Sequence, residues 1–287
     1  MEFVQVDVFT DTPYAGNALA VFPDAEALSA RAMQAIAAEM NLSETSFVTR
    51  ASGDSYDVRI FTPNGELPFA GHPTLGTAWA LRRRGAISGD EVVQVSKAGE
   101  TTVRLEGGQP WLSRAGTAHA DLEDTDPGAT RRIATALGLE ADDVGLEARE
   151  LGRPGRLRPA AADAGVHQLM VPLRDVATLG RCRPRADLLA AFEGIGVYCF
   201  TAVGAGRVRS RGFFPALGIA EDPGTGSAAA GLGLYLARRV GDIAFEIRQG
   251  VELGRPSRID VRASGESVAI GGRVVEVLSG RLERLPG

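Results

Sequence analysis

Apolar and polar residues alternate at the start of the chain, where Val4, Val6 and Val8 occupy every second position. This period predicts a half-buried strand. Residues 29–40 instead carry apolar side chains at helical spacing behind Ser29, a residue type that caps helices. Further elements of the first half are expected as strands at 18–22, 45–49 and 56–62, a helix at about 74–84 and a hairpin at 92–105. The pattern therefore predicts a mixture of strands and helices.

The pattern changes between about residues 116 and 165, where Asp, Glu, Gly, Pro and Arg are frequent and one helix is expected. After this connecting region the order of elements repeats. The second half is expected to hold a strand at 167–172, a helix at 185–192, strands at 197–203 and 208–213, a helix at 225–239 and strands between 245 and 278. We divide the chain into halves 1–115 and 116–287, with the last strand, at about 273–287, as a candidate to cross back to the first half.

Two short motifs match each other at a fixed offset of 150, which is 222 minus 72. The run His72-Pro73-Thr74-Leu75-Gly76-Thr77-Ala78 lies over Asp222-Pro223-Gly224-Thr225-Gly226-Ser227-Ala228. The match suggests duplication of one unit. Each motif precedes a helix, where unbonded backbone N–H groups attract anions. We expect a small carboxylate to contact Gly76, Thr77, Gly226 and Ser227. The alternative is that both motifs are only caps and turns, which their paired occurrence disfavours.

A proton-transfer group is also present. Glu44 stands between the first helix and a strand, and a carboxylate buried there would have a raised pKa and could act as general base and then acid. The alternative for a lone glutamate in a loop is a solvated surface charge. His72, beside a helix start, is expected to stay neutral and to pass a proton, unless it is only a turn residue. His119 and His167 lack partner spacing, so no metal site is expected.

Composition excludes several classes of protein. The formal net charge of −5 is scattered along the chain, so a nucleic-acid partner is not expected. Lys97 is the only lysine and lies in a hairpin, which disfavours Schiff-base and Walker-loop chemistry. A nicotinamide fingerprint beginning at Gly204 would need a glycine where Arg209 stands.

Cysteine usage and hydropathy bear on the compartment. The two cysteines, Cys182 and Cys199, form no Cys-x-x-Cys motif, and no leader segment is recognised, so we expect a reducing cytoplasm. The uncharged stretch 228–237 is far shorter than the roughly 20 residues of a membrane span, so no membrane association is expected.

As a set, several motifs resemble the PhzF family of phenazine biosynthesis. They are NLSETSFV, RIFTPNGELPFAGHPTLGTA, EDPGTGSAA, Gly16-Asn17, Gln249-Gly250 and Gly254-Arg255-Pro256-Ser257. The resemblance covers nearly the whole chain and is weakest at 118–164. It implies an α+β fold of the diaminopimelate epimerase type, with two pseudo-symmetric halves that each wrap a sheet around a central helix. It also implies a homodimer and proton transfer without a cofactor.

Carried over by position, the resemblance places the catalytic glutamate at Glu44 and a Gly-His pair at Gly71 and His72. The family's aspartate falls on Asp222, and its later glycine and serine fall on Gly226 and Ser227. Asn17 is added as a candidate substrate-binding residue. Related amino-acid epimerases carry two thiols near the helix starts, where this chain has none, so thiol-based racemisation is disfavoured.

The resulting hypothesis is an isomerase that moves a proton on a small carboxylate-bearing substrate, with Glu44 as general acid/base and His72 and Asp222 as further catalytic residues. The alternatives are an epimerase of the same fold and a non-catalytic binder of a small carboxylate. Glu44 favours an enzyme, because a second negative charge does not help to bind an anion. The resemblance does not transfer the identity of the substrate.

Overall fold

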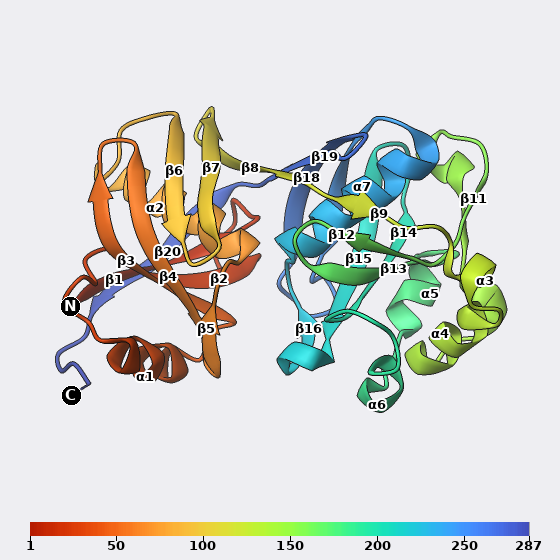
Figure 1. The fold of residues 1–287 in the computed structure, drawn as a ribbon, viewed down its shortest axis with the longest axis horizontal. Coiled ribbons are helices and arrows are strands. Elements are labelled where there is room, and N and C mark those ends of the chain that lie inside the picture. The colour runs from red at the N-terminus through yellow and green to blue at the C-terminus, as the bar shows by residue number, and fades with distance from the viewer. Residues whose placement is uncertain (287) are drawn as a thin grey trace. The chain divides into compact units, whose positions relative to one another are not determined.

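The computed structural model describes residues 1–286 and divides the chain into two compact units. The first is Met1–Ser113 with the C-terminal segment from Gly271, and the second is Arg114–Ile270. Figure 1 shows α2 among the strands of the first unit and α7 among those of the second. The expected α+β fold of two pseudo-symmetric halves, each with a sheet around a central helix, is confirmed.

The first unit contains a sheet, the central helix α2 and the outer helix α1. Its elements are β1 (Glu2–Val8), β2 (Asn17–Phe22), α1 (Ala30–Met40), β3 (Glu44–Ser52), β4 (Ser55–Thr62), β5 (Gly65–Leu67), α2 (Gly71–Arg83), β6 (Glu91–Ser96), β7 (Gly99–Glu106), β8 (Gln109–Ala115) and β20 (Val274–Arg281). As expected, Ser29 caps α1, because its side chain accepts the Ala32 N–H at 3.2 Å.

The second unit begins with the connecting region. Its elements are β9 (Thr117–Ala118), α3 (Leu122–Thr125), α4 (Ala129–Leu137), β10 (Leu146–Glu147), β11 (Arg156–Leu157), β12 (Ala160–Asp163), β13 (His167–Pro172), α5 (Val176–Arg181), α6 (Ala186–Leu189), β14 (Val197–Ala202), β15 (Arg207–Phe214), β16 (Ile219–Asp222), α7 (Gly226–Val240), β17 (Ile243–Gln249), β18 (Ser257–Ser264) and β19 (Ser267–Gly271). Short 3₁₀ turns lie at Ala141–Asp143, Ala148–Leu151 and Pro215–Leu217.

Strand pairing follows the same rule in both units. In the first, β1–β2, β3–β4, β4–β5 and β6–β7 pair antiparallel, whereas β2–β3 and β4–β6 pair parallel. In the second, β12–β13, β14–β15, β15–β16 and β17–β18 pair antiparallel, whereas β13–β14 and β15–β17 pair parallel. The antiparallel pairs β1–β20 and β12–β9 complete the repeat. The repeat is therefore topological and extends well beyond the two short motifs.

The register of the repeat differs from the sequence prediction. Helix α2 begins at Gly71 and α7 at Gly226, and the preceding strands end at Leu67 and Asp222, so the offset here is 155 (226 minus 71). The predicted offset of 150 was wrong at this point. Gly71 corresponds to Gly226 and His72 to Ser227, whereas Asp222 ends a strand.

Helix α2 packs closely against its sheet at a glycine. A Cβ atom at Gly76 would lie 2.7 Å from Leu19 Cδ2 and 2.8 Å from Val8 Cγ2, so only glycine lets the helix approach β1 and β2 this closely. Because α2 is buried on nearly all sides, its position is set by packing along its whole length.

The outer helix α1 covers the opposite face of the first sheet. Phe22 and Phe47 stack there with ring centroids 5.0 Å apart, and Phe61 meets Phe47 edge-on. Met33 and Ile36 of α1 pack on the same cluster. The strands β2 and β3 are therefore buried on both faces, which fixes the position of the first residue of β3, Glu44.

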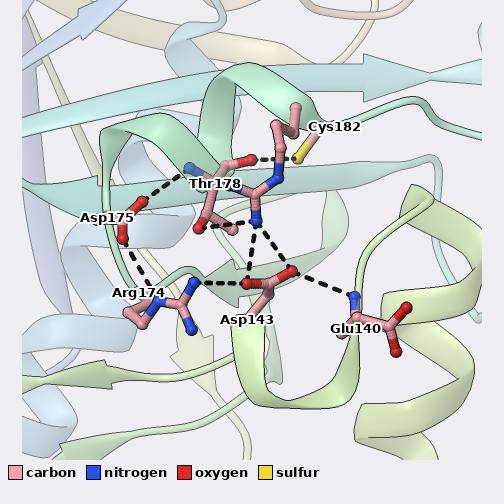
Figure 2. A network of polar contacts seen from close by, with 7 residues as sticks. Glu140, Asp143, Arg174, Asp175, Thr178 and Cys182 are labelled. Carbon is pink, nitrogen blue, oxygen red and sulfur yellow. Dashed lines mark hydrogen bonds and ion pairs between the residues drawn. The ribbon is translucent and has the colours of Figure 1, made fainter.

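A polar network in the second unit joins the connecting region to α5 (Figure 2). The buried carboxylate of Asp143 accepts a hydrogen bond from Arg174 at 2.8 Å and two from Arg181 at 3.1 Å. It also accepts the Glu140 N–H at 3.2 Å. Donors from three segments of one unit converge on this carboxylate, so its role is to hold the fold together.

Candidate functional site

Glu44 lies where α1 gives way to β3. Asn41 ends α1 with a left-handed backbone (φ 50°), and its N–H donates to the Ala37 carbonyl at 3.2 Å. Glu44 pairs with Leu19 in parallel register, and Leu19 contacts the α2 position Gly76. Because residues paired in register on neighbouring strands point to the same face of the sheet, the Glu44 side chain faces α2, as Leu19 does.

Burial dominates the electrostatics of Glu44. Only 13% of its side chain is exposed, and removal of the charged form from water raises the pKa of Glu44 to about 7. A hydrogen bond with Ser43 acts in the opposite direction but is the smaller effect. In the part of the chain that the structure describes, the buried Oε2 atom makes no hydrogen bond. The carboxyl group can therefore take up or release a proton near neutral pH.

His72 stands beside this carboxyl group in the first turn of α2. Its Nδ1 atom lies 3.6 Å from Glu44 Oε2, which is close but longer than a hydrogen bond. Asn17 Nδ2 lies 3.5 Å from the same ring nitrogen, and Ser43 Oγ donates to Asn17 Oδ1 at 3.1 Å. Asn17, Ser43, Glu44 and His72 thus form one polar cluster within the first unit.

Gly76 and Thr77, two of the residues predicted to contact an anion, do not lie in the first turn of α2. Because α2 begins at Gly71, the unbonded N–H groups of its first turn belong to Gly71 and His72, and the Thr74 N–H already donates to the Ala70 carbonyl. Gly76 is occupied in packing against the sheet, and Thr77 is fully buried. The sequence prediction placed the helix start too late, so Gly76 and Thr77 lie beyond the first turn of α2, and their contact with an anion stays a prediction.

The second unit holds Asp222, Gly226 and Ser227. Asp222 ends β16, is buried, and accepts a hydrogen bond from Thr225 Oγ1 at its Oδ2 atom. Gly226 and Ser227 are the first two residues of α7, where N–H groups have no carbonyl partner in the helix. Ser227 Oγ accepts a hydrogen bond from Gln168 Nε2 at 3.1 Å, which leaves the Ser227 hydroxyl proton available to a ligand.

Sequence reasoning missed the roles of two buried glutamines, Gln94 and Gln249, which bond to the starts of α2 and α7. Gln249 was noted only as part of a motif. The signal that could have found both is a polar residue in a strand two positions after an apolar residue of the same face, as Gln94 follows Val92 and Gln249 follows Ile247. Ser43, next to Glu44, was also missed.

The described residues, 1–286, also bear on metal binding and on membrane insertion. They contain no group of three or more His, Cys, Asp or Glu side chains placed to hold a metal ion. None of the helices in the same range is long and apolar enough to cross a membrane. Cys182 and Cys199 are free, buried thiols at the end of α5 and in β14.

The fold and the two groups of polar residues define a class, that of epimerase-like isomerases with two similar units. A predicted epimerase from Pseudomonas aeruginosa has the same fold, with a TM-score of 0.79 and 32% identity over 99% of both chains. A PhzF-family phenazine biosynthesis protein from Bacillus anthracis superposes with a TM-score of 0.82 and 25% identity over 98% of both chains.

Comparison of the sequence identifies the family more specifically than comparison of the fold. The family model of phenazine biosynthesis-like proteins, PhzC-PhzF, matches residues 6–280. A trans-2,3-dihydro-3-hydroxyanthranilate isomerase from Pseudomonas chlororaphis is 39% identical over 271 residues, which cover 92% of this chain and 91% of that protein. The chain belongs to the PhzC-PhzF family of phenazine biosynthesis-like proteins and is an enzyme of the isomerase class.

Proposed function

We propose that the protein catalyses a proton-shift isomerisation of a small carboxylate-bearing substrate without a cofactor, with Glu44 as general acid/base. The observation that carries this proposal is the buried carboxyl group of Glu44, whose pKa of about 7 suits both halves of a proton transfer. The network of Asn17, Ser43 and His72 beside it supplies polar contacts that orient the carboxyl group and a substrate.

The proposed reaction needs no oxidant or reductant. The Glu44 carboxylate removes a proton from a carbon made acidic by the substrate's carboxylate, so that a C–H bond breaks and an O–H bond forms. The same carboxyl group then returns the proton to another carbon. In the first unit, His72 is proposed to contact the reacting part of the substrate. In the second unit, the first turn of α7, at Gly226 and Ser227, is proposed to bind a carboxylate, and Asp222 is proposed as a further catalytic residue.

A deuterium-exchange experiment tests the role of Glu44. The protein is incubated in heavy water with trans-2,3-dihydro-3-hydroxyanthranilate, the compound in the name of the Pseudomonas chlororaphis relative, and with other cyclic and amino carboxylic acids. Loss of a C–H signal reports proton transfer. Glu44→Gln should lower the rate about 100-fold or more, because the amide cannot accept the proton.

The matched control is Glu91→Gln, which removes an exposed carboxylate of the same unit that pairs with Arg104. The control should retain the wild-type rate. Full activity of Glu44→Gln would exclude Glu44 as the acid/base. Deuterium uptake with inversion of the same carbon, and no shift to another carbon, would instead identify an epimerase.

We also propose that the protein is a homodimer, which the family resemblance supports, and that it lies in a reducing cytoplasm, which its two free cysteines support. Sedimentation equilibrium at micromolar concentration should give twice the chain mass of 30.1 kDa. A single species of the monomer mass would contradict the dimer.

A further inference from the structure

We infer that Gln249 is a positioning residue that acts through Thr225 to hold Asp222 as a hydrogen-bond acceptor, an inference that rests on the proposed function for the role of Asp222. All three residues lie in the second unit, at the end of β17, before α7 and at the end of β16. Gln249 is completely buried and Asp222 nearly so. Their contacts fix the direction of every hydrogen bond between them.

The orientation of the Gln249 amide is unambiguous. Its Oε1 atom accepts the backbone N–H of Thr225 at 3.1 Å, and an N–H group can only donate. Its Nε2 atom donates to the backbone carbonyl of Asp222 at 2.8 Å, and a carbonyl can only accept. An exchange of the amide oxygen and nitrogen would break both bonds.

This orientation determines where the Thr225 hydroxyl proton points. Gln249 Nε2 also donates to Thr225 Oγ1 at 2.9 Å, so that oxygen acts as acceptor toward Gln249. The single proton on Oγ1 is then directed to Asp222 Oδ2. Thr225 makes no side-chain capping bond to α7, so its hydroxyl is committed to this connection. A carboxylate that receives such a donor is stabilised in its ionised, accepting form.

Two further hydroxyl groups form hydrogen bonds that lead toward Gln249. Ser210 Oγ donates to the Tyr198 hydroxyl at 2.8 Å, and that hydroxyl donates to Gln249 Oε1 at 2.7 Å. Ser210 and Tyr198 are completely buried, so water does not compete for these bonds. The chain of hydrogen bonds therefore holds Gln249 in place and ends on the carboxylate of Asp222.

The first unit contains the same three residue types with a different ending. The Tyr56 hydroxyl donates to Gln94 Oε1 at 3.1 Å, and Gln94 Nε2 donates to Thr74 Oγ1 at 2.9 Å. Thr74 Oγ1 then donates to the Ala70 carbonyl at 2.8 Å. Gln94 and Gln249 differ by 155, the same offset that relates the two helix starts. Both networks brace a central helix, but only the second ends on a carboxylate.

This difference provides a natural control for a spectroscopic test. Protein labelled with ¹³C at aspartate carboxyl groups is compared with Asp222→Asn, which identifies the Asp222 signal by its loss. Thr225→Val keeps the shape of the side chain and removes the hydroxyl, and Thr225→Ser keeps the hydroxyl. Thr74→Val removes the hydroxyl that Gln94 contacts in the first unit.

We expect the Asp222 signal to move in Thr225→Val and in Gln249→Leu, and to stay in place in Thr225→Ser and Thr74→Val. Thr74→Val should still lower the thermal midpoint, because it removes the brace of α2. An unmoved signal in Thr225→Val would overturn the inference, as would an equal movement in Thr74→Val. Thr225→Ala serves as a second hydroxyl-free variant if the valine variant does not fold.

The deuterium-exchange assay separates this inference from the proposed function. Thr225→Val should lower the exchange rate about tenfold, and Thr225→Ser should restore it. If the Asp222 signal behaves as expected but no probe exchanges, the proposed function fails and the positioning role stands. If exchange is strong in Thr225→Val and the signal is unmoved, the positioning role fails and the proposed function stands.

Discussion

Replacing Glu44 with glutamine should stabilise the protein above neutral pH, although the proposed function predicts that it slows proton transfer about 100-fold or more. Glutamine has nearly the same shape as glutamate and carries no charge. The buried Glu44 carboxyl has a pKa of about 7, whereas the usual value is 4.5. The folded protein therefore holds a proton on Glu44 in a pH range where the unfolded chain has released it.

The sign and size of the effect follow from this difference. Because the pKa is raised in the folded state, the free energy of unfolding falls as pH rises from about 4.5 to about 7. Above that range the cost is constant. A difference of 7 minus 4.5, at about 1.4 kcal/mol per pH unit, corresponds to roughly 3–4 kcal/mol. Glu44→Gln does not carry this cost.

Urea titrations at pH 5 and pH 8.5 measure the effect. The free energy of unfolding of Glu44→Gln should exceed that of wild type by about 3–4 kcal/mol at pH 8.5 and by much less at pH 5. Glu66→Gln is the control of opposite sign, because hydrogen bonds from Arg59 and Lys97 lower the pKa of Glu66 to about 2. Its carboxylate stabilises the fold above about pH 4.5, so the variant should lose similar stability at both pH values.

One result would refute the reasoning about Glu44. If the stability difference between wild type and Glu44→Gln is the same at pH 5 and at pH 8.5, then burial does not raise the pKa of this carboxyl group. The proposal that Glu44 exchanges protons near neutral pH would then lose its electrostatic basis.

Two further predictions concern ligands. Purified protein should contain no stoichiometric metal, pyridoxal, flavin or nicotinamide. Elemental analysis and an absorbance spectrum check this prediction, and one equivalent of zinc or a bound chromophore would contradict it. In calorimetry with sulfate or a small carboxylate, Gly226→Val should abolish binding by blocking the backbone at the start of α7, and Ser227→Ala should weaken it modestly. Unchanged binding in Gly226→Val, with loss in variants of Arg153 or Arg156, would place the anion at the connecting region.

Local patterns in the sequence predicted the longer elements, but not shorter ones such as α5, Val176–Arg181, and β5, Gly65–Leu67. The helix expected at 29–40 is α1, Ala30–Met40, and the repeated order of strands and helices is present in the structure. These features depend on periodicity and on caps such as Ser29, which are encoded in neighbouring residues. For Glu44 the sequence left two alternatives, a buried carboxylate and a solvated surface charge, and in the structure only 13% of its side chain is exposed.

The register at the central helices was not predictable from the motif letters. Pro73 is the third residue of α2, whereas Pro223 precedes the start of α7 by three residues. Proline is acceptable in both places, so the same residue type occupies different backbone positions in the two motifs. For this reason the prediction placed Gly76 at the start of the helix. The close contact between Gly76 and Leu19 joins residues that are far apart in the sequence, so the motif did not reveal it. The pairing of Gln249 with Thr225 is equally non-local.

The repeat also explains why acid/base chemistry is assigned to the first unit. Glu44 is the first residue of β3 and pairs with Leu19 in parallel register. The corresponding first residue of β14 is Val197, which pairs with Leu169 in the same way and is buried. A valine there adds apolar burial to the fold, whereas the buried carboxyl group costs roughly 3–4 kcal/mol above neutral pH. The strand β14 therefore begins with a stabilising residue, Val197. The matching strand β3 begins with a destabilising one, Glu44, which the fold itself does not require. Such a cost at a single position, in an otherwise matching pair of strands, is what a site selected for proton transfer is expected to show.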